Sequence, residues 1–163
     1  MRKTELAYLA GIVDGEGSIS VKSESKKRPY VVYLSVTNTN YDMIKIFETL
    51  FGGKVRKRNW SAHQKSKNAA NWKPCYEWCI SKRQAATAVS KLLPYIRIKS
   101  KQAVLLLRLH RIRKKYNGVY LRHHPEIKSR IIAIFERIKQ RCKKLNKRGV
   151  NEELLVRPKE ERI

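Results

Sequence analysis

The sequence predicts an α+β fold, in which a four-stranded antiparallel sheet carries helices on one face and leaves its other face open. Stretches with helical apolar spacing alternate with stretches in which apolar and polar residues alternate. Their order is helix, two strands, helix, two strands, helix, and the last third is again helical. A length of 163 residues suits one domain with a sizeable core. We expect that domain at residues 1–150 and a polar tail at residues 151–163.

The first expected element is a helix that is capped by Thr4 and stopped by Gly17. One helix face is apolar and carries Leu6, Leu9, Ala10 and Val13. A second stripe has almost no side chains and consists of Ala7, Gly11 and Gly15. Glycine inside a helix costs up to about 1 kcal/mol relative to alanine. The stripe therefore predicts close contact with another backbone, as in a dimer interface.

Two strands are expected next, from Ser18 to Lys26 and from Pro29 to Thr37, joined by a turn. Their inward residues are Ile19, Val21, Val32, Leu34 and Val36. A helix capped by Thr39 or Asn40 then runs to about Phe51 and stops at Gly52-Gly53, with Met43, Phe47, Leu50 and Phe51 inward.

Strands from Lys54 to Trp60 and from Cys75 to Ser81 complete the sheet, with an extended basic loop at 61–73 between them. In the last strand, the inward residues are Tyr76, Trp78 and Ile80. Three further helices are expected, at Lys82–Leu93, at Lys101–Lys115 and from Pro125 or Glu126 to about Leu145. The second has Ala103, Leu106, Leu107 and His110 on one stripe, so His110 is expected to be a packed core histidine.

The composition points to a polyanionic partner. The net charge is +25, and nucleic acid is the common partner of such a folded chain. The sequence shows no apolar run long enough for a membrane span and no signal peptide. The cysteines are sparse and odd in number, which favours an intracellular location in the cytoplasm, nucleoid or an organelle. A zinc site of Cys75 and Cys79 with His123 and His124 has poor spacing.

The open sheet face is a candidate surface for reading DNA bases in the major groove. Its candidate contact residues are Ser20, Lys22, Glu24, Lys26, Tyr33, Ser35, Arg56, Arg58, Glu77 and Cys79. From Arg97 to Arg148 there are 18 Lys or Arg residues against two acids, which favours phosphate contact, including one by Lys101. The alternative is a solvated polar surface, and the net charge and the first helix decide against it.

The end of the first helix carries the candidate chemistry. Glu16 stands at a helix C-terminus, where the dipole repels a carboxylate unless a cation binds. Hard divalent metals take carboxylate and carbonyl oxygens together, so Glu16 and the carbonyl of Gly15 are candidate ligands. If two copies pack along their small stripes, two carboxylates meet as in a two-metal phosphodiester site. The alternative is an ordinary helix with a glycine stop and an exposed acid.

Residues 9–17, LAGIVDGEG, resemble the LAGLIDADG motif, with Ile12 for Leu, Val13 for Ile, Gly15 for Ala and Glu16 for the second Asp. The sequence contains one copy of the motif. Its length and layout resemble the single-motif homing endonucleases, which act as homodimers. The resemblance extends from about Leu6 to about Leu145 and is strongest at the motif and around 93–102.

This resemblance implies a site-specific, metal-dependent DNA endonuclease that uses Mg²⁺ or Mn²⁺. A homodimer would bind a long, roughly palindromic double-stranded site and cut across the minor groove to leave short 3′ overhangs. Lys99 matches a family lysine near the metal and its water network, and Asn38 matches a polar residue that orients water. Asp42 stands where the family often has a basic residue, so the basic part of the pocket must come from elsewhere.

Two other functions are compatible with the sequence. One is a non-cleaving protein of the same fold, either a DNA regulator or a maturase with intron RNA as its partner. Glutamate at position 16 is one methylene longer than the usual aspartate, which supports this alternative, whereas the retained acid and Lys99 favour the enzyme. The other is a ribosomal or structural RNA-binding protein, which explains the charge but not the motif.

Overall fold

The computed structural model describes residues 1–23, 30–58, 73–116 and 118–147. Its sheet is antiparallel and has the order β1-β2-β4-β3, so the predicted α+β class is confirmed. The strands are β1 (Gly17–Lys22), β2 (Val31–Asn38), β3 (Lys54–Arg58) and β4 (Cys75–Ser81). The helices are α1 (Lys3–Glu16), α2 (Tyr41–Phe51), α3 (Lys82–Leu92), α4 (Ser100–Lys115), α5 (Gly118–His123) and α6 (Pro125–Leu145).

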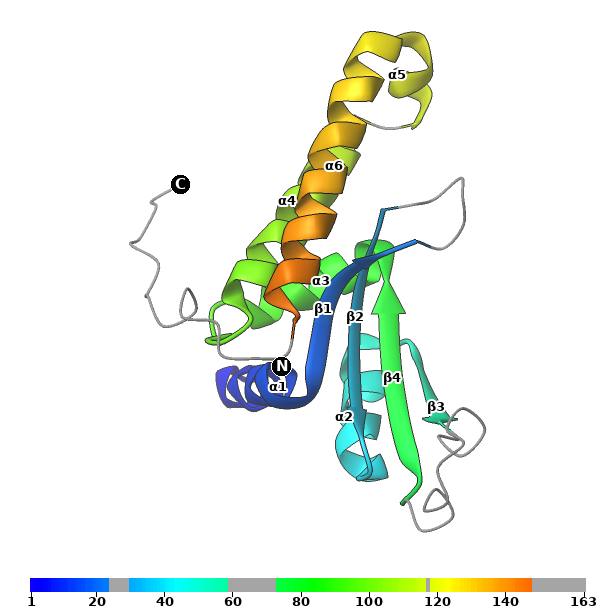
Figure 1. Cartoon of the computed structure of the whole chain (residues 1–163). Helices are drawn as coiled ribbons and strands as arrows, with labels where there is room; N and C mark the ends of the chain where they lie inside the picture. Colours follow the sequence, from blue (N-terminus) through cyan, green and yellow to red (C-terminus); the bar gives the residue numbers. More distant parts are fainter. Residues whose placement is uncertain (24–29, 59–72, 117, 148–163) are drawn as a thin grey trace.

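The helices surround one side of the sheet and extend beyond it (Figure 1). α1 leads directly into β1 and lies at the end of the sheet where β1 begins. α2 and α3 pack behind the central strands. α4 and α6 run side by side, contact β1, and continue as an arm whose far tip is α5 (Figure 1).

Strand register places the predicted inward residues on the helical side. Gly17 pairs with Val36 and Lys22 with Val31, so alternate residues of β1 and β2 face the same way. The buried inward residues are Ile19, Val21, Val32, Leu34, Val36, Trp78 and Ile80. The prediction is confirmed for these seven residues, whereas Tyr76, also predicted to be inward, is only partly buried, and Ser35, predicted to be outward, is buried.

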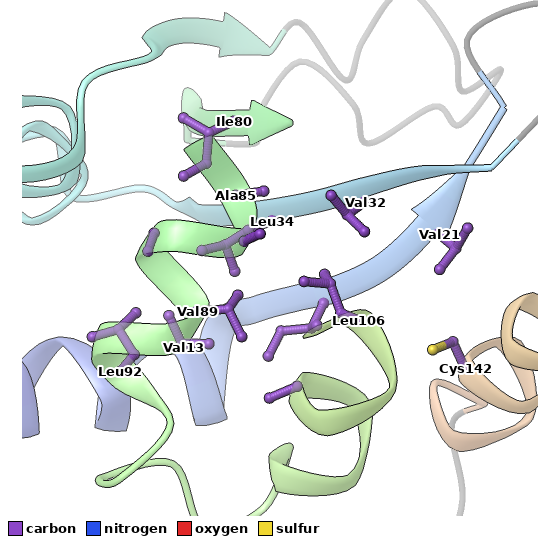
Figure 2. Packing of buried hydrophobic residues seen from close by; sticks show 14 of the residues in the cluster. Val13, Val21, Val32, Leu34, Ile80, Ala85, Val89, Leu92, Leu106 and Cys142 are labelled. Atoms are coloured by element: carbon purple, nitrogen blue, oxygen red, sulfur yellow. The ribbon is translucent and has the colours of Figure 1, made fainter. Parts of the chain in front are cut away.

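The core joins α1, the sheet and the later helices into one cluster. Figure 2 shows Val13 of α1 beside Val89 and Leu92 of α3, while Val32 and Leu34 project from β2 toward the helices. At the other end, the rings of Phe47 and Trp78 have centroids 5.0 Å apart. The predicted apolar face of α1 is confirmed, because Leu9, Ala10 and Val13 are fully buried.

Several predicted boundaries are wrong by a few residues. α1 begins at Lys3 rather than after Thr4, because the backbone N–H of Arg2 donates to Glu5 Oε2 at 2.6 Å and closes the first turn. β2 begins at Val31, and its predicted start at Pro29 lies outside the described residues. The short helix α5 was not predicted, since none of its six residues is buried and it has no apolar period.

The other turn signals were interpreted correctly. Asn40 caps α2 by accepting the N–H of Met43 at 3.0 Å. Gly52 and Gly53 have φ angles of 69° and 92°, a conformation that side-chain-bearing residues rarely adopt. The predicted ends of two strands at Lys26 and Trp60, the loop at 61–72 and the tail lie outside the described residues. None of the helices in the described ranges has the length and apolar content to cross a bilayer.

Candidate functional site

The C-terminal end of α1 is attached to the segment that precedes α4. The carboxylate of Asp14 accepts the backbone N–H groups of Arg97 at 2.7 Å and of Lys99 at 2.9 Å. In return, the ammonium of Lys99 donates to the carbonyl of Val13 at 3.0 Å and to that of Asp14. Residues more than 80 positions apart in sequence therefore meet at one helix end.

Lys99 neutralises this helix end electrostatically. Its ammonium lies at the C-terminal end of α1, where the last carbonyls carry the negative end of the helix dipole. Burial lowers the pKa of Lys99, while the nearby carboxylates of Asp14 and Glu16 act in the opposite direction. Because an ammonium has three donors and two are used, one N–H can still point to water or to an anion.

Glu16 is the exposed acid of this site. It is the last residue of α1, next to exposed Gly15 and within electrostatic range of Lys99. The geometry thus brings the predicted acid and the predicted lysine together.

The oxygen donors at this helix end are of the type that binds a divalent metal, but they are too few to complete its coordination. The carboxylate of Glu16 and the carbonyl of Gly15 are hard oxygen donors of the type that Mg²⁺ prefers. Nearly octahedral coordination needs more oxygens than these two, and Mg²⁺ sites commonly fill the remaining positions with water and substrate phosphate oxygens. No group of three or more His, Cys, Asp or Glu side chains suited to a metal occurs in the part of the chain that the structure describes.

Asn38 lies at the same end of the sheet but already has a local partner. It is the last residue of β2, two positions beyond Val36, the partner of Gly17. Its side-chain oxygen accepts the N–H of Asn40 at 2.9 Å, which shapes the turn into α2. Asp42 follows in the first turn of α2 and is exposed.

The small stripe of α1 faces solvent. Ala7, Gly11 and Gly15 are exposed, and a Cβ added at either glycine would meet nothing within 4 Å. Their neighbour Tyr8 is 55% exposed, although it is a large aromatic residue. Packing within one chain therefore does not explain why these positions are small.

The outer sheet face holds an ordered array of charged and polar groups. The ammonium of Lys22 lies 3.5 Å from the ring centroid of Tyr33, and Arg58 Nε lies 3.0 Å from Glu77 Oε2 across β3 and β4. Burial and a hydrogen bond with Cys79 raise the pKa of Tyr33, so its phenol stays protonated. Burial also lowers the pKa of Lys22.

The candidate contact residues differ in accessibility. Arg56 is exposed and is paired in register with Glu77, whereas Ser35 is only 5% exposed. The hydroxyl of Ser20 is buried without a hydrogen-bond partner among the described residues. Lys101 is half-buried in the first turn of α4. Glu24 and Lys26 lie outside the described residues.

Two predictions about single side chains need comment. His110 is only partly buried, so it is not a core histidine; instead it lines a cavity. Cys75 and Cys79 are free thiols on the outer face of β4, and Cys142 is a free thiol buried in α6.

Solved structures with the same fold are DNA-bound homing endonucleases. The homing endonuclease I-CvuI, in complex with the I-CreI target in the presence of Mg with the DNA not cleaved, is 24% identical with a TM-score of 0.66, covering 94% of this chain and 90% of its own. An archaeal intron-encoded homing endonuclease complexed with DNA is 15% identical with a TM-score of 0.61, covering 93% and 92%. The group I intron-encoded homing endonuclease I-CeuI, complexed with DNA, is 16% identical with a TM-score of 0.58, covering 84% and 67%.

The fold of this chain is therefore that of the LAGLIDADG homing endonucleases. No protein-family model matches the sequence, and no curated protein does.

The sequence interpretation did not assign a role to Asp14. Its signal was present, because it is the first acid of the nine-residue motif, and an acid in the last turn of a helix opposes the dipole. Such a residue needs a compensating donor, and the structure supplies two N–H groups from a distant segment.

Proposed function

We propose that this chain is a homing endonuclease that binds double-stranded DNA as a homodimer and cuts one phosphodiester bond in each strand. The observation that carries the proposal is the C-terminal end of α1, where exposed Glu16 lies within electrostatic range of Lys99. The exposed stripe of small residues on α1 ends at the same place, with Gly15. The fold shared with DNA-bound homing endonucleases supports it. As an enzyme acting on DNA, it would work inside the cell.

The stripe supports the homodimer. Contact between Ala7, Gly11 and Gly15 and the same residues of a second copy would bring two α1 backbones close together. Each copy would then deliver one Glu16 to the same groove, which matches a duplex with two strands to cut. Each subunit would read one half of a long, roughly palindromic site with the outer face of its sheet.

The site residues would divide the work. Glu16 and the Gly15 carbonyl would hold Mg²⁺ or Mn²⁺, which when bound supplies charge neutralisation at the phosphate and acidifies water. Lys99 would direct its remaining N–H toward the phosphate or its water, from a position fixed by its two carbonyl partners. Asn38 would orient water only if its side chain left Asn40. By resemblance, cutting would leave short 3′ overhangs.

A DNA library incubated with Mg²⁺ and then with Ca²⁺ tests the proposal. We expect defined double-strand breaks with Mg²⁺, and none with Glu16→Gln, which should still bind DNA. Glu126→Gln is the matched control, since Glu126 is an exposed acid in the first turn of α6 and should leave cutting unchanged. Cutting by Glu16→Gln would contradict the metal assignment.

The dimer has a separate test in Gly11→Leu. Because Gly11 is exposed and a Cβ added there would meet nothing within 4 Å outside the backbone of its own helix, the isolated subunit should keep its fold. Sedimentation should then show a monomer where the unmodified chain is a dimer, and cutting should be lost. A dimer that survives this substitution would refute contact along the stripe.

A non-cleaving DNA- or RNA-binding protein of the same fold, with intron RNA as a further candidate partner, is the second candidate. Asp42 and Glu16 favour it, since one replaces a basic residue and the other is longer than aspartate. Sequence-specific binding without breaks under any divalent ion would support this candidate over the enzyme.

A further inference from the structure

A second basic site lies on the helical side of the sheet, away from Glu16. A cavity of about 830 Å³ opens between the start of β2, α3 and α4. Five of its lining residues can be positively charged, and we call it the basic cavity: Lys82, Arg83, His110, Arg113 and Lys114. None of the described residues that line it is acidic.

The basic cavity is separate from the helix-end site. Val31 at its wall pairs with Lys22, five residues along β2 from Val36, the partner of Gly17. At about 3.4 Å per residue, this places the cavity about 17 Å from the start of β1. Its cations come from α3 and α4 rather than from the outer sheet face that is expected to read bases.

The charges around the cavity would favour an anion. Burial, followed by the positive charges of Lys114, Arg113 and Arg83, lowers the pKa of His110. These groups therefore repel further positive charge in the space that they enclose. α3 also begins at the rim, so the positive end of its dipole adds to the same field.

The walls suit a nucleotide unit rather than a bare ion. Val31, Val32 and Leu109 close the base of the cavity but are at most 2% exposed, so its accessible apolar wall consists mainly of the aliphatic stems of its Lys and Arg residues. Its volume falls within the range of about 300–1,000 Å³ that is typical of small-molecule sites. Sugar and base can contact the apolar wall while the phosphate faces the guanidinium groups.

We propose that the basic cavity binds a phosphodiester segment of a nucleic-acid strand, at a site that is distinct from the sheet face. The strand is either DNA flanking the bound duplex or a separate RNA. Both offer the same phosphate chemistry, and the experiment distinguishes them. The inference does not require cleavage, so it survives if the chain proves to be a non-cleaving binding protein.

The test replaces two of the cavity's cations and keeps the one that has a hydrogen bond to the backbone. Arg83→Gln with Lys114→Gln changes two exposed lining residues and leaves Arg113, which donates to the Tyr30 carbonyl at 2.6 Å, in place. The matched control is Lys91→Gln with Arg111→Gln, exposed cations of the same two helices that do not line the cavity. Both full-length double variants remove the same charge.

Binding of a random-sequence duplex DNA and of a random-sequence single-stranded RNA is measured over a series of NaCl concentrations. Each lost phosphate contact reduces the slope of log K against log salt by about 0.9 for duplex and about 0.7 for single strands. We expect the cavity variant to lose about 1–2 units of slope with at least one probe and the control variant less than half as much. A reduced slope with the duplex alone identifies flanking DNA as the ligand, and a reduced slope with the RNA alone identifies RNA. A reduced slope with both probes means that the cavity binds the phosphodiester backbone of either nucleic acid.

Equal slopes in the two variants, or no loss in either, would overturn the proposal. The imidazole of His110 gives a second readout by NMR, because a phosphate placed among Arg83, Arg113 and Lys114 must raise its pKa. An unchanged His110 titration in the presence of a probe that binds would also overturn it.

Discussion

Replacement of Asp14 by alanine should destabilise the fold more than any other change at an exposed or half-buried position of α1. The Asp14 carboxylate attaches α1 to the backbone of Arg97 and Lys99 by accepting both of their N–H groups. Removing it leaves two N–H donors without their partner and frees the segment that positions the Lys99 ammonium. The hydrogen bonds from the Lys99 ammonium to the carbonyls at the end of α1 are then weakened as well.

The magnitude follows from the two bonds. Hydrogen bonds to charged groups contribute about 1.5–3 kcal/mol each, so two contribute about 3–6 kcal/mol. The bond from Arg97 lies at the surface, where water replaces it readily, so we take the lower end, about 3 kcal/mol. Asp14→Asn keeps one acceptor oxygen and should lose about half of that.

Urea unfolding followed by circular dichroism measures this effect at one fixed protein concentration, because a dimer unfolds in a concentration-dependent way. Glu16→Ala is the matched control, since it removes an exposed carboxylate from the same helix turn and should change stability by no more than about 0.5 kcal/mol. A loss below about 1 kcal/mol for Asp14→Ala would refute the structural role of the carboxylate. An equal loss in both variants would mean that the helix end responds to charge alone.

Three further outcomes are expected. His110 has a folded pKa below its ordinary value of 6.5, so the unfolded chain binds the proton first and stability falls as pH drops through about 6.5; urea unfolding at two pH values should show a smaller fall for His110→Gln. Burial raises the pKa of Cys142 to about 11, so a thiol reagent at pH about 8 should label Cys75 in the native state and Cys142 only on unfolding; early labelling of Cys142 would contradict its burial. Glu77→Gln should cost less than about 1 kcal/mol in thermal unfolding, yet alter base preference in a binding selection, since it removes the carboxylate that pairs with Arg58 Nε.

Periodic burial made most of the fold predictable. Strands whose alternate residues are buried, such as β1 with Ile19 and Val21, carry their orientation in the sequence, because a shift of one residue would expose every apolar side chain. Asn40 and the Gly52-Gly53 pair fixed the limits of α2 in the same local way. Nothing comparable marks α5, which buries no side chain.

The candidate site was only partly predictable, because its contacts cross the whole chain. The motif placed Glu16 at a helix end, and the resemblance suggested Lys99. Nothing in the local sequence indicates that the Lys99 ammonium donates two hydrogen bonds to backbone carbonyls of α1. Nor does it indicate that Ser35 is buried. These facts depend on how distant segments pack, which residue spacing does not encode.

The two acids of the motif have different surroundings, which suit one to a structural role and the other to a catalytic role. Asp14 is half-buried and accepts two backbone N–H groups, so it stabilises the junction between α1 and the segment before α4. Glu16 is exposed on the unfavourable end of the same dipole, and the positive charge of Lys99 lies close by. Among the described residues, the Glu16 carboxylate has no hydrogen bond or ion pair, so it is available to bind a cation. We therefore expect the first acid to respond to stability assays and the second to respond to assays of cleavage.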